Sequence, residues 1–77
     1  MLELTETQVY LVRHNATLSA NDIYDDLKKG HHDNGRPYST DLIQSMQTEL
    51  SEQVIIIESC NEVLSNTIDT AQYRTLL

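Results

Sequence analysis

The sequence predicts one small, mainly α-helical domain of three helices, on three observations. The chain has 77 residues, which is too short for a second hydrophobic core. Both glycines and the only proline lie within residues 30–37, so strong turn residues interrupt the chain at one place. Elsewhere apolar residues recur at intervals of three and four, the spacing of an amphipathic helix. We therefore expect a single domain over residues 1–77 with one irregular loop.

The first helix is expected over residues 5–14. Thr5 and Gln8 have the spacing of a capping box, in which the threonine hydroxyl and the glutamine side chain satisfy two free backbone N–H groups. Asn15 is a suitable helix end. Because the apolar residues between them are also good strand formers, a strand over residues 8–13 is the alternative.

The second helix is expected over residues 19–29. Ser19 can cap its start, and Lys28 and Lys29 complement the negative end of the helix dipole before Gly30 ends the helix. A flexible, basic and histidine-rich loop over residues 30–38 follows from the glycines and the proline.

The third helix is expected over residues 39–52, with a possible continuation to about residue 66. An apolar seam supports the continuation, and its members are Ile43, Met46, Leu50, Val54, Ile57 and Leu64. Four consecutive β-branched residues from Val54 onward favour a β-hairpin over residues 54–66 instead. Both alternatives are open at this point. The tail over residues 69–77 can form a last helical turn or two.

Part of the chain, residues 4–27, resembles the opening helices of winged-helix domains such as the DNA-binding domain of the ferric uptake regulator. The matching residues are Leu4, Thr5, Gln8, Leu18, Ser19, Ala20, Ile23 and Tyr24. The resemblance implies a helix-turn-helix with a third helix in the DNA major groove and a β-hairpin wing at residues 54–66. However, the expected third helix carries no Lys or Arg, the residues that supply most phosphate contacts.

The charge of the chain is strongly negative but unevenly distributed. Five basic minus twelve acidic residues give −7, made up of −4 over residues 1–27, +2 over residues 28–36 and −5 over residues 37–77. Such a charge repels anionic lipid and the phosphates of nucleic acid. The basic stretch is the exception and a candidate anion or nucleic-acid contact: Lys28, Lys29, His31, His32, Arg36 and Tyr38. The simpler interpretation is a solvated helix end.

Acidic residues of the second half form the main candidate binding face. On one helix they fall largely on the side away from the apolar seam, and they are Glu49, Glu52, Glu58, Glu62 and Asp69. Such a face often serves only solubility. The functional alternative is that it occupies a basic groove of another protein, as DNA-mimicking inhibitors do.

Several classes of protein are not expected. No catalytic motif is recognisable, and His31, His32 and Asp33 lack the four spaced ligands of a zinc site, so we expect neither an enzyme nor a metal or other cofactor. The single cysteine, Cys60, cannot form an intrachain disulfide. With no secretory signal or long apolar run, a cytoplasmic (intracellular) location is expected.

The sequence therefore predicts an acidic protein-interaction module that binds and modulates another protein, with inhibition of a nucleic-acid-binding protein as the specific form. Because one short chain covers the apolar seam only in part, a homodimer through the seam is expected. The alternative is a winged-helix DNA-binding regulator that uses residues 28–36. A phage, plasmid or chromosomal origin fits either function.

Overall fold

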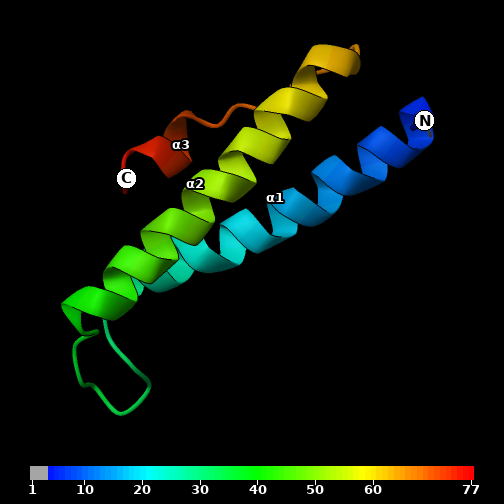
Figure 1. The fold of residues 1–77 in the computed structure, drawn as a ribbon. Coiled ribbons are helices and arrows are strands. Elements are labelled where there is room, and N and C mark those ends of the chain that lie inside the picture. Colours follow the sequence, from blue (N-terminus) through cyan, green and yellow to red (C-terminus); the bar gives the residue numbers. More distant parts are fainter. Residues whose placement is uncertain (1–3) are drawn as a thin grey trace.

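A computed structural model describes residues 4–77, and in it two long antiparallel helices carry a short third one (Figure 1). The helices are α1 (Glu6–Lys29), α2 (Thr40–Val63) and α3 (Ala71–Arg74). The mainly helical, three-helix fold predicted from the sequence is confirmed, and the described residues contain no strand longer than an isolated bridge. The positions of the three helices differ from those expected.

The start of α1 follows the predicted capping box. The Gln8 backbone N–H donates to the Thr5 hydroxyl at 3.2 Å, and the Thr5 backbone N–H donates to Gln8 Oε1 at 2.8 Å. Two of the free N–H groups at the helix start are thereby satisfied by neighbouring residues. The alternative of a strand over residues 8–13 is wrong.

The helices predicted over residues 5–14 and 19–29 are one continuous helix, so the predicted end at Asn15 and start at Ser19 are wrong. Both residues have cap-forming side chains, but no Gly or Pro forces a break between them. Ala16 and Ala20 lie in the core with 5% and 0% of their surfaces exposed, and burial of this stretch against α2 requires it to stay helical.

The loop between the long helices begins and ends where the sequence predicts. Gly30 adopts a φ of 78°, a conformation that suits glycine, and its N–H donates to the Asp26 carbonyl. The loop closes on itself, because the N–H of His32 donates to the Arg36 carbonyl at 2.7 Å. Ser39 then caps α2 by accepting from the Leu42 N–H at 3.1 Å.

α2 continues to Val63, so the β-hairpin alternative over residues 54–66 is wrong. The four β-branched residues lower helix propensity only slightly, whereas packing against α1 buries two of them. Val54 and Ile57 are 1% and 0% exposed. Tertiary contact thus decides the secondary structure of this stretch.

The core lies between the two long helices and is closed on one side by α3. Its buried members are Ala16, Ala20, Leu50, Val54, Ile57 and Tyr73. The small alanines of α1 allow α2 to approach closely, and Tyr73 reaches in from α3, which Figure 1 shows beside α2.

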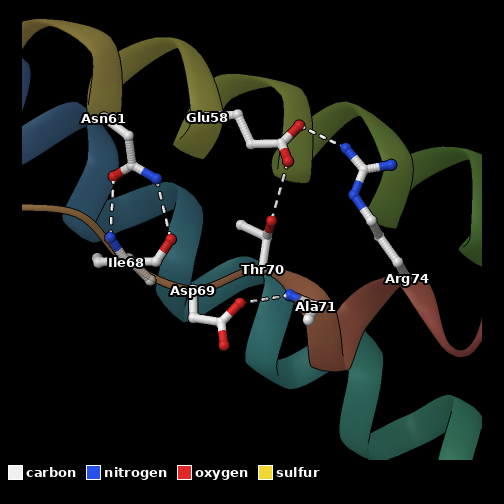
Figure 2. A network of polar contacts seen from close by, with 7 residues as sticks. All are labelled: Glu58, Asn61, Ile68, Asp69, Thr70, Ala71 and Arg74. Atoms are coloured by element: carbon white, nitrogen blue, oxygen red, sulfur yellow. Dashed lines mark hydrogen bonds and ion pairs between the residues drawn. The ribbon is translucent and has the colours of Figure 1, made fainter.

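Polar contacts fasten the C-terminal segment to α2 (Figure 2). The Asn61 side-chain amide pairs with the backbone of Ile68 in both directions, at 2.9 and 3.0 Å. Glu58 accepts from the Thr70 hydroxyl at 2.9 Å and also binds the Arg74 guanidinium. These contacts hold a segment whose own helix has only four residues, too few to be stable alone.

A buried arginine joins the open end of the helix pair to the same segment. Arg13 is only 2% exposed, and its Nη1 donates to Asn61 Oδ1 and to the Asn66 carbonyl at 2.8 and 2.7 Å. Its Nη2 donates to Asn66 Oδ1 at 2.8 Å. The partners are neutral oxygens, and no carboxylate of the described residues pairs with the guanidinium. Its Nε is buried without a hydrogen-bond partner among those residues.

Candidate interaction surface

The outer face of α2, opposite its buried side, combines exposed apolar residues with acids. We define it by Glu52, Ile55, Ile56, Ser59, Glu62 and Val63, which helical periodicity places on one side of α2. Ile55 and Val63 are 57% and 59% exposed, and Ile56 is 37% exposed. Large apolar side chains are thus presented to solvent together at the C-terminal half of the helix.

The N-terminal half of the same helix presents polar and acidic groups. A shallow surface depression there is lined by Asp41, Gln44, Ser45, Thr48, Glu49 and Glu52. α2 as a whole contains five acidic residues and no Lys, Arg or His. The helix therefore offers a surface that is apolar at one end, polar at the other and negative along its length.

The predicted acidic face is divided by the structure into two groups with different roles. Glu58 holds the C-terminal segment, and Asp69 accepts from the Ala71 N–H at 2.9 Å, so both serve the fold (Figure 2). Glu49, Glu52 and Glu62 are exposed, and neither ion pair found within residues 4–77 includes them. These three carboxylates are the ones available to another molecule.

The predicted oligomer seam lies largely inside the chain. Leu50, Val54 and Ile57 are fully buried against α1 and α3. The other three seam residues, Ile43, Met46 and Leu64, are half-buried. The sequence pattern did not show that α1 folds back onto this side of α2, and so the seam does not offer the free surface on which the dimer prediction relied.

The Glu58 carboxyl has a pKa below the usual 4.5, because it accepts hydrogen bonds from Arg74 and, second, from Thr70. A carboxyl whose pKa is lower in the folded state stabilises that state above the unfolded-state pKa and loses the effect as pH falls through the folded-state pKa. We therefore predict that the C-terminal segment loosens in acid below the normal glutamate range. Amide hydrogen exchange of residues 68–74 as a function of pH measures this.

The control for this prediction is Glu58→Gln, whose amide oxygen can still accept from Thr70. This variant should show faster exchange at neutral pH and a weaker pH dependence. An unchanged pH profile in Glu58→Gln would show that other groups titrate, and the assignment to Glu58 would then be wrong.

The basic loop residues gather at the closed end of the helix pair, where several already have intrachain contacts. Lys29 binds Asp33 at 2.7 Å, and this contact raises the lysine pKa and lowers the aspartate pKa. Lys28 lies 5.2 Å from the Tyr24 ring centroid, and His32 packs edge-on against Tyr38 at 4.8 Å. The exposed ion pair contributes little to stability.

The histidines of the loop do not build a metal site with their neighbours. His31 Nδ1 lies 2.9 Å from the His32 carbonyl oxygen. A shallow hollow is lined by His32, Asp33, Asn34 and Arg36. Within residues 4–77 no group of three His, Cys, Asp or Glu side chains is placed to hold a metal ion.

Sequence reasoning missed the exposed apolar residues of α2. The β-branching of Ile55 and Ile56 favoured a strand, although their offset from Val54 and Ile57 places them outside the seam on a helix. Helical periodicity carried through residues 54–63 would have separated the buried pair from the exposed one.

Comparison with known proteins identifies no relative. No protein-family model, curated protein or solved structure matches the chain. In the described part of the chain, no helix is both long and apolar enough to cross a membrane.

Proposed function

We propose that this chain is a small protein-binding module that modulates a partner protein by covering the partner's basic surface with the outer face of α2. The observation that carries the proposal is the composition of that face. Ile55 and Val63 are more than half exposed on a helix that has five acidic residues and no basic one. Exposed apolar residues bordered by charge are typical of protein interaction sites.

The chemistry of this face specifies its partner. Glu52 and Glu62 lie one on each side of Ile55 and Ile56 along α2, and Glu62 adjoins Val63, so a matching surface has apolar groups with Lys or Arg beside them. The charge of −7 on the whole chain would speed the approach of such a partner and make association sensitive to salt. A protein that binds nucleic acid through this kind of surface would lose access to its phosphate ligand, and modulation would take the form of inhibition.

The proposal predicts a large effect of reversing charge on this face. Glu52→Lys combined with Glu62→Lys should weaken partner binding at least about tenfold, because both attractive contacts become repulsive. A photo-reactive amino acid at exposed Ser59 would capture the partner in cells, and the affinity of the captured protein would then be measured at low and high salt.

The matched control is Asp22→Lys with Asp26→Lys, which makes the same change in net charge on α1. Both aspartates are exposed. If the control weakens binding as much as the α2 variant does, only total charge matters and the outer face of α2 is not the site. Binding that is equally tight at high salt would likewise contradict the proposal.

A DNA-binding regulator is the second candidate, because Lys28 and Lys29 end α1 and Arg36 lies in the loop that follows it. Arg13 is buried and Arg74 binds Glu58, so the other cations of the chain do not extend this cluster. A gel shift on random DNA separates the two functions. Protein binding through α2 predicts no shift at physiological salt, whereas DNA binding through the loop predicts one that Lys28→Ala removes.

A further inference from the structure

The C-terminal segment, residues 65–77, lies on the two long helices as a bound peptide lies on a receptor. Only the four residues of α3 are helical, and residues 64–70 before them form neither helix nor strand. A segment with so little secondary structure has no stable conformation alone. Its conformation therefore depends on the surface that α1 and α2 provide.

The helices hold the segment partly by its main chain. The Asn61 side-chain amide pairs with both the N–H and the carbonyl of Ile68 (Figure 2). Near the other end, the Gln47 amide donates to the Leu76 carbonyl at 2.8 Å. Main-chain groups are the same in every sequence, and hydrogen bonds to them are a common source of affinity for extended peptides.

Four side chains of the segment supply the specificity of this contact. Thr70 and Tyr73 are buried, and both of their hydroxyls donate to side chains of the long helices. Ile68 and Leu76 are half-buried against the same core. The other side chains between residues 67 and 75 are exposed. The surface thus recognises an aliphatic residue, a threonine, a tyrosine and a second aliphatic residue, at positions 68, 70, 73 and 76.

The two long helices can remain paired when the segment leaves. α1 packs extensively on α2, whereas α3 contacts α2 at few places. The caps of the helices at Thr5, Gly30 and Ser39 are also made without the segment. Release would leave Leu50 and Val54 uncovered, and an apolar surface of this kind favours a new occupant.

We propose that the surface under the C-terminal segment, which we call the segment site, is a peptide-binding site with the segment as its built-in occupant. Its ligand is a segment of another protein with the same chemistry, extended at first and ending in one helical turn. The ligand carries aliphatic, threonine, tyrosine and aliphatic side chains at the spacing of Ile68, Thr70, Tyr73 and Leu76. This site goes beyond the proposed function, because it lies on the core side of the helices and leaves the outer face of α2 free.

A segment of another protein suits the site better than the segment of a second copy. Exchange between two copies requires both segments to be released, and it brings together two chains that each carry a charge of −7. The segment itself has one acidic and one basic residue, Asp69 and Arg74. A peptide that resembles it therefore approaches with little repulsion.

The attached segment competes with any such ligand. A short connection to α2 gives the segment an effective concentration in about the millimolar range. A peptide binds only while the segment is released, so its apparent affinity falls with the released fraction. Variants that weaken the hold on the segment should therefore bind the peptide more tightly.

A fluorescent synthetic peptide of residues 65–77, titrated with the full chain, tests the proposal by fluorescence anisotropy. Tyr73→Ala in the chain should tighten peptide binding at least about tenfold relative to the wild type, because the competitor is weakened. Arg74→Ala, a change at an exposed side chain that removes the ion pair with Glu58, keeps the core intact and should act in the same direction. It provides the test if circular dichroism finds Tyr73→Ala unfolded.

Two altered peptides test the chemistry of the ligand on the same chains. The peptide with Tyr73→Ala should bind at least about tenfold more weakly, because it lacks the buried ring. A peptide in which the exposed Thr67, Gln72 and Thr75 are replaced by alanine should bind within about threefold of the unaltered peptide.

The proposal would be overturned if neither variant chain, still helical, bound the peptide saturably, or if the peptide without tyrosine bound equally well. A mixed dimer of wild-type and Tyr73→Ala chains in sedimentation, tighter than the peptide complex, would make a second copy the occupant and also overturn it. Glu52→Lys with Glu62→Lys should leave peptide binding unchanged, and loss of binding there would place the peptide on the outer face of α2 instead. These measurements need no partner of that outer face, so their failure leaves the proposed function untouched.

Discussion

Replacing Arg13 with alanine should lower the free energy of unfolding by about 3–5 kcal/mol, the range for truncating a large buried side chain to alanine, because its hydrogen bonds are lost as well. The guanidinium is 2% exposed and supplies three hydrogen bonds to Asn61 and Asn66. Without it, Asn61 Oδ1 and two oxygens of Asn66 lose a donor, and a cavity forms at the open end of the helix pair. A domain of this size has a total stability of roughly 4–12 kcal/mol, so the variant would lose a large share of its stability.

Two further variants at this position separate hydrogen bonding from packing. Arg13→Met retains most of the volume and removes the buried charge, so it should lose less stability than Arg13→Ala. Arg13→Lys retains the charge but not the planar fork that reaches Asn61 and Asn66 together, and it should be markedly destabilised. Urea unfolding followed by circular dichroism measures all three. A loss below about 1 kcal/mol for Arg13→Ala would contradict a structural role for the network.

Three of the four ends of the long helices could be predicted because their causes are local, whereas the C-terminal end of α2 could not. The capping box at Thr5, the left-handed Gly30 and the cap at Ser39 each involve residues no more than four positions apart. The interior of α1 could not be predicted in the same way. Asn15 and Ser19 have the side chains of helix ends, and only burial of the intervening turn against α2 overrides that preference.

The candidate site was harder to predict than the helices, because it depends on which side of α2 the rest of the chain covers. The periodicity identified an apolar seam, but not that α1 and Tyr73 would fill it. In the same way, Glu58 belonged to the acidic pattern, yet Arg74, 16 residues away, binds it. The partners of Arg13 lie 48 and 53 residues away, beyond the reach of any local pattern.

Tyr73 anchors the C-terminal segment, and its replacement by alanine should cost about 3–5 kcal/mol of stability. Its side chain is among the largest fully buried ones, at 1% exposed, and meets the Tyr24 ring edge-on with centroids 5.7 Å apart. Its hydroxyl donates to Asn21 Oδ1 at 2.5 Å. α3 has only four residues and cannot persist without this burial, so the variant should release the segment and expose Leu50 and Val54.

Tyr73→Phe is the matched control, since it keeps the ring in the core and removes only the hydroxyl bond, at a cost of about 1 kcal/mol. Urea unfolding gives the stability of each variant, and hydrogen exchange over residues 68–77 reports release of the segment directly. If the ring is the anchor, exchange in this segment should increase strongly in Tyr73→Ala and remain slow in Tyr73→Phe. Equally fast exchange in the two variants would instead assign the anchor to the hydroxyl, and slow exchange in Tyr73→Ala would assign it to the Glu58 contacts with Thr70 and Arg74.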